Sequence, residues 1–186
     1  MSQDEYRDGV LSRRHFLIGC TALAGSLLVP SAYASIARKP ERRLTMVNLH
    51  TGERARITYW AQGSYVKESL REINHLLRDH RTGDTVQMDR ELLDLLYSLQ
   101  QKVESKKEFQ VISGYRSPKT NAMLRTKSSA VAKKSLHMQG KAIDIRLPGT
   151  SLKHLRKAAL ALNSGGVGYY PKSNFIHVDT GKVRYW

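Results

Sequence analysis

The chain has 186 residues and carries 31 Lys and Arg against 16 Asp and Glu, a formal net charge of +15. This length suits a single domain, and the presence of only one cysteine, Cys20, excludes a scaffold held by intrachain disulfides. The basicity does not by itself indicate a nucleic-acid-binding protein, because the charge is spread along the chain and aromatic residues do not cluster with it.

The first 34 residues have the features of an export signal. Two adjacent arginines, Arg13 and Arg14, precede a moderately apolar run over residues 15–29. Residues 32–34 then form a small-x-small cleavage site. The apolar run of about 15 residues is short for a bilayer span. The pattern predicts a twin-arginine-type signal peptide over residues 1–34 and a periplasmic protein, with an uncleaved membrane anchor as the alternative.

Cys20 ends a short segment that resembles a lipoprotein box. Only five residues separate Arg14 from Cys20, too few for the apolar core that lipidation needs, so we expect no lipid anchor. A basic lead-in is expected over residues 35–43, before a folded domain over residues 44–186 that has no stable membrane span. An exported basic protein meets anionic lipids and wall polymers, so the charge is interpreted as a general attraction to the cell envelope.

The first part of this domain predicts a hairpin and two helices. Two runs rich in β-forming residues flank residues 50–52, which is typical of a β-hairpin. Apolar residues at helical spacing over 66–77 predict a helix with Ser64 as its N-cap. A second helix is expected to begin at Asp89, and its leucine-rich face fits packing in the core.

The second part alternates strands and helices. A buried strand over residues 109–113 precedes a helix that starts at Pro118. A basic loop over residues 125–134 leads to a strand around Asp144, and Ser151 is expected to cap the next helix. Two more short strands are expected near the carboxyl end. This order predicts an α+β fold, a single domain with a mostly antiparallel sheet flanked by helices.

Two of the predicted strands place a polar side chain in an apolar setting. Asp144 lies among isoleucines in AIDIRL, where a buried carboxylate is costly unless a partner offsets its charge. His177 lies on the later strand, FIHVD, and His137 lies in the loop seven residues before Asp144. Two imidazole nitrogens and one carboxylate oxygen suit one zinc ion with a fourth position open to water, the arrangement of a catalytic site.

The motif around two of these residues is more specific than their spacing. Residues 135–144 contain S-x-H-x-x-G-x-A-x-D, which resembles the signature of the zinc peptidases related to D-Ala-D-Ala carboxypeptidases, VanX and Sonic hedgehog. In that family the His and Asp of the motif and a histidine of a later strand bind zinc. The resemblance implies that His137, Asp144 and His177 hold one Zn²⁺ per chain, in a hedgehog/D-Ala-D-Ala peptidase-like fold.

Further segments extend the resemblance along nearly the whole chain. The signal, NLHTGE, ISGYRS, GVGYYPKSNFIHVDTG and the terminal YW are similar to the murein endopeptidase K family of the bacterial periplasm. In that family the arginine of the segment that matches ISGYRS contacts the substrate or the transition-state oxygen. The resemblance implies this catalytic and substrate-binding role for Arg116. Ser135 and Tyr169 are the other expected substrate contacts, and Tyr170 is a further candidate to line the substrate groove. The alternative for Tyr169 and Tyr170 is that one packs in the core and the other lies on the surface.

One position departs from the family pattern. Many members carry Glu or Asp three residues before the last zinc histidine as general base, and this chain has Asn174, which cannot take up a proton. A base is still needed to handle the proton of a zinc-bound water. Asp179, on the same strand face as His177, is the first candidate for that catalytic role. The alternative is that Asp179 only orients a ligand histidine.

The resemblance implies a monomeric, zinc-dependent murein endopeptidase that hydrolyses peptide cross-links of peptidoglycan, with stem peptides as substrate and no nucleic-acid partner. The cleaved bond can be a D-Ala–diaminopimelate link or a diaminopimelate–diaminopimelate link. The family resemblance favours including the second among the substrates. Only nine residues follow His177, which leaves little chain for a lid and favours a groove open at both ends. The rivals are a non-catalytic peptidoglycan-binding module, favoured by Asn174, and a D,D- or L,D-carboxypeptidase of the same fold.

Overall fold

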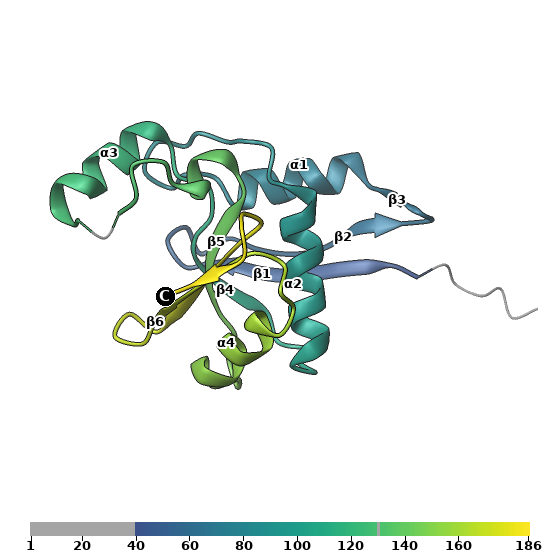
Figure 1. Ribbon diagram of the computed structural model, residues 1–186. Coiled ribbons are helices and arrows are strands. Elements are labelled where there is room, and N and C mark those ends of the chain that lie inside the picture. The colour runs from purple at the N-terminus through teal and green to yellow at the C-terminus, as the bar shows by residue number, and fades with distance from the viewer. Residues whose placement is uncertain (1–39, 130) are drawn as a thin grey trace, which may run out of the picture. The chain divides into compact units, whose positions relative to one another are not determined.

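The strands of the protein belong to one mixed sheet (Figure 1). The computed structural model describes residues 40–129 and 131–186. Within these residues the strands are β1 Arg42–Asn48, β2 Arg54–Ala61, β3 Ser64–Tyr65, β4 Phe109–Ser113, β5 Ala142–Arg146, β6 Gly166–Tyr170, β7 Phe175–Asp179 and β8 Arg184–Tyr185. They are arranged in the order β3-β2-β1-β4-β5-β7-β6-β8, and only the β1–β4 and β6–β8 pairs are parallel. The predicted α+β fold with a mostly antiparallel sheet is confirmed.

Three of the four α-helices in the described residues begin at a capping side chain. The described residues form α1 Lys67–Leu76, α2 Arg90–Lys102, α3 Pro118–Lys127, the 3-10 helix η1 Leu136–Gln139, and α4 Leu152–Leu160. The side chains of Asp89, Ser117 and Ser151 each accept a hydrogen bond from a first-turn N–H group of α2, α3 and α4. Such bonds satisfy N–H groups that have no partner within the helix. The predicted starts at Asp89, Pro118 and Ser151 are therefore confirmed.

The first helix begins later than the sequence pattern predicted. Ser64 lies in β3, where it pairs with Ala61 of β2, and the N-cap of α1 is Val66, which makes no side-chain capping bond. The prediction of Ser64 as N-cap is therefore wrong. Gln62 and Gly63 have positive φ angles of 53° and 86°, so the chain closes a tight hairpin turn here instead of starting a helix.

Two other boundaries differ from the sequence expectations. Strand β1 begins at Arg42, inside the segment expected as a lead-in, because Arg42 pairs with Trp60 of β2. Helix α3 continues to Lys127, inside the segment expected as a loop, and its last turn closes with a bond from Ser128 N to Leu124 O. The predicted signal peptide over residues 1–34 lies outside the described residues.

The apolar core lies where α1, α2 and α4 pack against the sheet. Helix α1 contacts β2, α2 contacts β1 and α4, and α4 contacts β6 and β7. On the central strands, Ile143 and Ile145 of β5 and Ile176 and Val178 of β7 belong to this core and are fully buried. Because side chains alternate along a strand, the residues between them lie on the opposite face of the sheet, and Asp144 is one of these.

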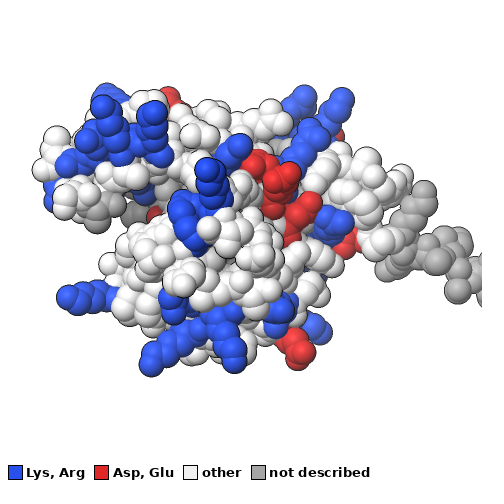
Figure 2. All heavy atoms as spheres, in the orientation of Figure 1, with Lys and Arg blue, Asp and Glu red and all other residues white. Residues whose placement is uncertain are grey.

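The charged surface has no single basic block on the face shown in Figure 2. Lys and Arg side chains form separate groups there, one over α3 and another near α4. This distribution agrees with the spread of charge along the sequence. In the described part of the chain, no helix combines the length and the apolar character that crossing a membrane requires.

Candidate metal centre

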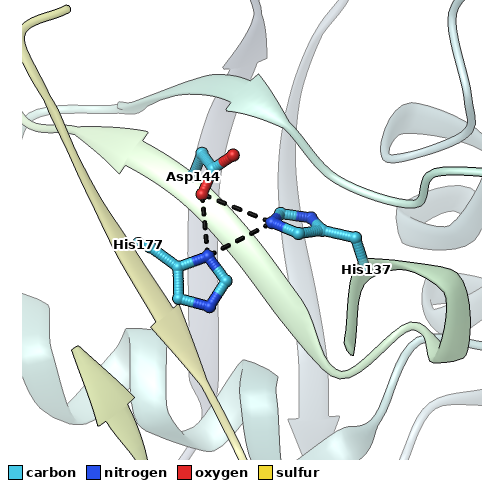
Figure 3. Close-up of side chains that lie close together, drawn as sticks. All are labelled: His137, Asp144 and His177. Atoms are coloured by element: carbon cyan, nitrogen blue, oxygen red, sulfur yellow. Dashed lines mark hydrogen bonds and ion pairs between the residues drawn. The ribbon is translucent and has the colours of Figure 1, made fainter. Parts of the chain in front are cut away.

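Three elements bring the predicted ligands together on the sheet face opposite the helical core (Figure 3). Asp144 of β5 and His177 of β7 are direct partners in the antiparallel ladder. Helix η1, which immediately precedes β5, places His137 beside them. The three residues are buried, with 3%, 6% and 8% of the surface exposed for His137, Asp144 and His177. The structure therefore assembles the three predicted ligands at one buried point.

The ligand atoms have the spacing of a metal site. His177 Nδ1 lies 2.9 Å from Asp144 Oδ1, and His137 Nε2 lies 3.2 Å from His177 Nδ1 and 3.3 Å from Asp144 Oδ1. Zinc bonds of about 2.0–2.1 Å at tetrahedral angles put neighbouring ligand atoms about 3.3 Å apart. In the described residues this is the one group of three or more His, Cys, Asp or Glu that converges in this way. The three side chains fit a single four-coordinate ion.

Outer hydrogen bonds fix which nitrogen of each imidazole faces the centre. His137 Nδ1 lies 2.8 Å from the backbone oxygen of Gly114, and His177 Nε2 lies 2.9 Å from Asp179 Oδ2. Both partners are acceptors, so these two nitrogens carry the protons in the neutral rings. The other nitrogens, His137 Nε2 and His177 Nδ1, are left with free lone pairs that point to the centre. This is the usual support of a metal-binding histidine.

Asp179 is fully buried, and both of its oxygens accept hydrogen bonds. Oδ1 accepts hydrogen bonds from the backbone of Gly166 at 3.0 Å and Gly181 at 2.8 Å, and Oδ2 contacts His177. Arg184 contacts both oxygens, at 3.1 and 2.7 Å. Burial acts to raise the pKa of Asp179, but these hydrogen bonds outweigh it and hold the pKa well below its ordinary value. A carboxylate held in this way suits orientation of His177.

The charges of the centre depend on one another. Burial acts to raise the pKa of Asp144, but the nearby imidazoles of His137 and His177 outweigh it and the pKa is lowered. Burial acts to lower the pKa of His177, but hydrogen bonds to Asp144 and Asp179 outweigh it and the pKa is raised. The centre therefore favours positive charge, either a proton on His177 or a metal ion beside Asp144. This charge offsets the cost of burying Asp144.

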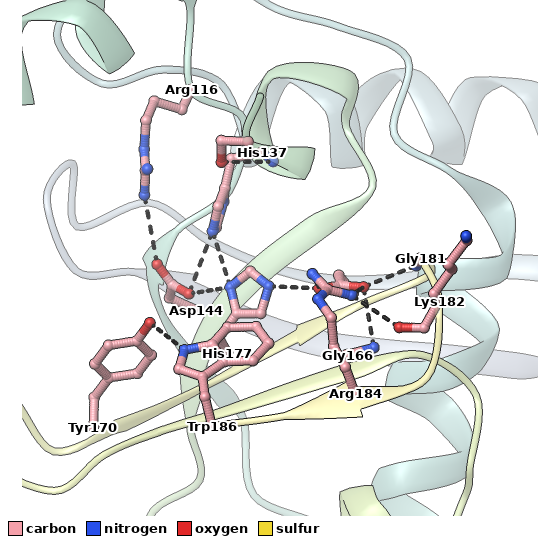
Figure 4. A network of polar contacts seen from close by, with 12 residues as sticks. Arg116, His137, Asp144, Gly166, Tyr170, His177, Gly181, Lys182, Arg184 and Trp186 are labelled. Carbon is pink, nitrogen blue, oxygen red and sulfur yellow. Dashed lines mark hydrogen bonds and ion pairs between the residues drawn. The ribbon is translucent and has the colours of Figure 1, made fainter. Parts of the chain in front are cut away.

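A cleft of about 560 Å³ opens over the ligands. Arg116 lines one side, and its Nη2 lies 3.8 Å from Asp144 Oδ2 (Figure 4). Tyr170 and Trp186 line the other side. Among the described residues, Asp144 is the only carboxylate that lines this cleft. The cleft therefore combines a candidate metal centre, a cationic side and an aromatic side.

The predicted substrate contacts have different surroundings. Ser135 lines the cleft and caps η1, because its side chain accepts a hydrogen bond from His137 N. Tyr169 packs against the core, and the guanidinium of Arg156 lies 5.2 Å from its ring centroid. Alternation along β6 turns Tyr170 instead of Tyr169 toward the cleft. The geometry does not support Tyr169 as a substrate contact and agrees with the alternative that one of the two tyrosines packs in the core.

Asn174 is not among the residues that line the cleft over the candidate ligands. It ends the turn between β6 and β7 with a positive φ of 53°, a conformation that asparagine tolerates better than most residues. Asn174 lines a separate depression of the surface together with Gln110 and Arg146. The position at which many family members carry a base therefore serves a turn in this chain.

Sequence reasoning missed the contacts of Arg184 and Trp186 and the role of the Gly114 carbonyl. The glycines near Asp179 were the available signal. A Cβ added at Gly166 would collide with the Asp179 carboxylate and the Arg184 guanidinium, and one at Gly168 would lie 2.7 Å from the Trp186 ring. Close packing at these two glycines therefore holds Asp179, Arg184 and Trp186 in place.

An α+β domain with one buried His-Asp-His centre beneath an open cleft has the character of a mononuclear metal-dependent hydrolase. Residues 36–186 match the family model described as peptidoglycan L,D-endopeptidase MepK, and the chain belongs to this family of metal-dependent peptidases. The resemblance to that family found in the sequence is thus confirmed.

Individual relatives cover almost the whole chain. The protein is 44% identical over 174 residues to peptidoglycan L,D-endopeptidase MepK of Escherichia coli (strain K12), an alignment that spans 94% of this chain and 96% of the relative. The protein of the same name from Shigella flexneri has the same identity and coverage. The probable peptidoglycan L,D-endopeptidase MepK of Haemophilus influenzae is 42% identical over 175 residues, or 94% of each chain.

Proposed function

We propose that the protein is a zinc-dependent endopeptidase that hydrolyses peptide cross-links of peptidoglycan. The observation that carries this proposal is the buried triad of His137, Asp144 and His177, whose ligand atoms lie 2.9–3.3 Å apart beneath an open cleft. Membership of a peptidase family and relatives named peptidoglycan L,D-endopeptidases support this substrate. They also favour a bond of L,D type, which includes the diaminopimelate–diaminopimelate link.

The three side chains would hold the metal with two nitrogens and one oxygen. This donor set suits zinc and leaves one position for water, as in catalytic zinc sites. Bound zinc would lower the pKa of that water toward neutrality and polarise the scissile carbonyl. The outer bonds of His137 to Gly114 and of His177 to Asp179 would keep both ligand nitrogens aimed at the ion.

Arg116 would stabilise the oxyanion that develops during hydrolysis. Its backbone N donates to His137 O at 3.2 Å, which ties it to the helix of the first ligand. The next residue, Ser117, donates its N–H to buried Asp79 at 2.8 Å, so the turn is held from both sides. Burial lowers the pKa of Arg116, but a guanidinium starts from so high a value that it keeps its charge. A fixed cation beside the metal is suited to stabilise developing negative charge.

Asp179 would act as a positioning residue for His177. Two roles were open for this carboxylate, a general base or an orienting group. Its full burial, its contacts with Arg184 and two backbone N–H groups, and its lowered pKa support the orienting role. A general base needs a free lone pair within reach of the reacting proton, and the bonds to Asp179 occupy both oxygens.

Export by the twin-arginine route would deliver the enzyme to its substrate in the periplasm. The signal rests on Arg13, Arg14 and the apolar run after them. Replacing both arginines with lysine is expected to leave precursor in the cytoplasm, measured by fractionation. Unchanged export in cells that lack a working twin-arginine translocase would contradict this route. The monomeric state stays a prediction.

Muropeptide profiling tests the proposed reaction. Zinc-loaded protein is expected to convert cross-linked dimers of purified sacculi into monomers, with little release of terminal D-alanine from uncross-linked stems. A chelator and the Asp144→Ala variant are the matched controls, and both should leave the dimers intact. Loss of pentapeptide monomers with dimers untouched would indicate a carboxypeptidase. Binding to sacculi with no change in any muropeptide would indicate a non-catalytic module.

A further inference from the structure

The last residues of the chain return to the metal centre. Strand β8 pairs with β6 in parallel, and two backbone bonds extend this pairing to Trp186. Trp186 N donates to Val167 O at 3.2 Å, and Tyr169 N donates to Trp186 O at 3.0 Å. The segment that follows β7 thus supplies a fixed side of the cleft.

The indole of Trp186 has a prepared place beside His177. The two ring centroids are 5.3 Å apart, and the indole Nε1 donates a hydrogen bond to Tyr170 Oη at 2.7 Å (Figure 4). The guanidinium of Arg184 lies 5.1 Å from the indole centroid. Gly168 provides the space, because a Cβ there would lie 2.7 Å from the indole ring. The position of the ring is therefore determined by four neighbours.

The same ring is nevertheless open to solvent. Trp186 is 48% exposed and lines the cleft with Tyr170 and Phe175, whose own rings stack at 4.6 Å. Among the described residues four large apolar side chains are exposed, and Val183, Tyr185 and Trp186 are three of them. An exposed apolar group that is held rigidly beside a reaction centre is typical of a binding surface.

We propose that Trp186 is a substrate-binding residue of this cleft, with Tyr170 and Phe175 as its support. This inference rests on the proposed function. The indole face takes the methylene chain of a diamino-acid stem residue, while Arg116 on the other side of the cleft faces its carboxylate. Lys134 also lines the cleft and adds positive charge to it. An aromatic face is a rigid apolar surface that loses little conformational entropy on binding. The two sides of the cleft thereby match the two chemical parts of the cross-linked peptide.

Kinetics of the zinc-loaded protein on a purified cross-linked muropeptide dimer test the proposal. Trp186→Ala is expected to raise KM about tenfold or more, because loss of an aromatic anchor is among the costlier interface truncations. The kcat should stay within about threefold of wild type, and zinc content should not change. Trp186→Phe, which keeps a ring over Gly168, should recover most of the affinity. Trp60→Phe on β2 removes the other tryptophan and is the matched control with unchanged kinetics.

The Trp60→Phe variant also leaves Trp186 as the only tryptophan, so its fluorescence reports on the cleft. Stopped-flow mixing with the dimer should change this emission before cleavage. An unchanged KM in Trp186→Ala would overturn the proposal. A lower kcat with loss of zinc would also overturn it, because that result would mean that Trp186 only supports His177. If the wild type does not cleave the dimer, the proposed function fails. The fluorescence change then decides separately whether Trp186 contacts the peptide.

Discussion

The two histidines of the proposed metal centre are held by different groups on its two sides, a loop side and a strand side. On the loop side, His137 of η1 bonds to a neutral backbone carbonyl, that of Gly114, at 2.8 Å. On the strand side, His177 bonds to the buried carboxylate of Asp179, which in turn contacts Arg184. One ligand is positioned by close backbone packing and the other by buried charge, so the two sides should respond differently to mutation and to pH.

The loop side depends on the approach of two backbone segments. Tyr115 N donates to Leu77 O at 2.7 Å, and Ser117 N donates to Asp79 Oδ2 at 2.8 Å. These bonds place the turn that carries the Gly114 carbonyl. Gly114 itself lies so close to the segment after α1 that an added Cβ would be 2.5 Å from Leu77 O. A change in volume here should move the carbonyl on which His137 depends.

The largest loss of zinc and of activity is expected from substitutions of the three proposed ligands, which lie between the loop side and the strand side. His137→Ala, Asp144→Ala and His177→Ala should each lose the bound zinc and the peptidase activity, because each removes one of three protein ligands. Metal analysis of the purified variants measures this. Zinc content like that of the wild type in His137→Ala and Asp144→Ala would end the metal-centre account.

Gly114→Ala should be the most damaging change outside the ligands. Its Cβ collides with backbone that is held by hydrogen bonds, so we expect a loss of about 1–3 kcal/mol in stability, as for overpacked interiors, and a strong fall in activity. Gly149→Ala is the control, since Gly149 has a positive φ of 81° but no atom within 4 Å of an added Cβ. Urea denaturation compares the two. Gly114 has no positive φ, so unchanged stability and activity in Gly114→Ala would contradict the collision at Leu77.

Asp179→Asn tests the strand side through its charge. Zinc affinity should fall by about 10–100-fold, the usual effect of losing the outer partner of a metal-bound histidine. At saturating zinc the kcat should stay near that of the wild type, because Asp179 acts through His177. Zinc titration followed by activity measurement separates the two quantities. A kcat that remains roughly 100-fold lower in the zinc-saturated variant would instead assign general-base action to Asp179.

Zinc affinity should depend on pH through the strand side. Zinc needs His177 Nδ1 without a proton, and the carboxylates of Asp144 and Asp179 raise the pKa of His177 after outweighing burial. Protons should therefore begin to compete with zinc at a higher pH than for an ordinary histidine, and affinity should fall as pH decreases through that range. In Asp179→Asn the onset should move to lower pH. Affinity that is independent of pH down to the ordinary range of histidine would contradict the raised pKa.

Asp79 gives the smallest expected effect, on the loop side. Burial acts to raise its pKa, but hydrogen bonds from Thr120 and from the backbone of Arg81 and Ser117 outweigh it, and the pKa is lowered. A lowered pKa stabilises the fold above the ordinary value of about 4, and this contribution is lost as pH falls through the native-state pKa. Asp79→Asn should cost about 1–2 kcal/mol at pH 7 and less at pH 3, measured by urea denaturation. An equal cost at both pH values would exclude the charged bonds as its cause.

The three proposed ligands could be predicted from the sequence because local patterns carry them. A carboxylate among isoleucines needs a partner, and the spacing of His137 and Asp144 lies within one short motif. The caps Asp89 and Ser151 were equally local. The prediction that Ser64 caps a helix is wrong because Gln62 and Gly63, both with positive φ, form a hairpin turn before it. In the sequence alone, a Gly-Ser pair before an apolar helical pattern is equally typical of a helix start.

The support of the ligands was not accessible in the same way. The face that Tyr169 occupies depends on the register of β6 against β7, which no local pattern sets. Arg184 and Trp186 reach the centre through a two-residue strand paired in parallel with β6. The carbonyl of Gly114 carries no side-chain signal at all. Contacts of this kind follow from packing between segments that are distant in the sequence.

One metal ion, held by His137, Asp144 and His177, is proposed to perform the cleavage of cross-links. The most direct test strips the protein with a chelator, adds back zinc in steps, and follows conversion of cross-linked muropeptide dimers to monomers. Activity should return in proportion to zinc and level off at about one ion per chain, while Asp144→Ala stays inactive at every step. Full activity of the stripped protein, or recovery of Asp144→Ala to the level of the wild type, would contradict the account.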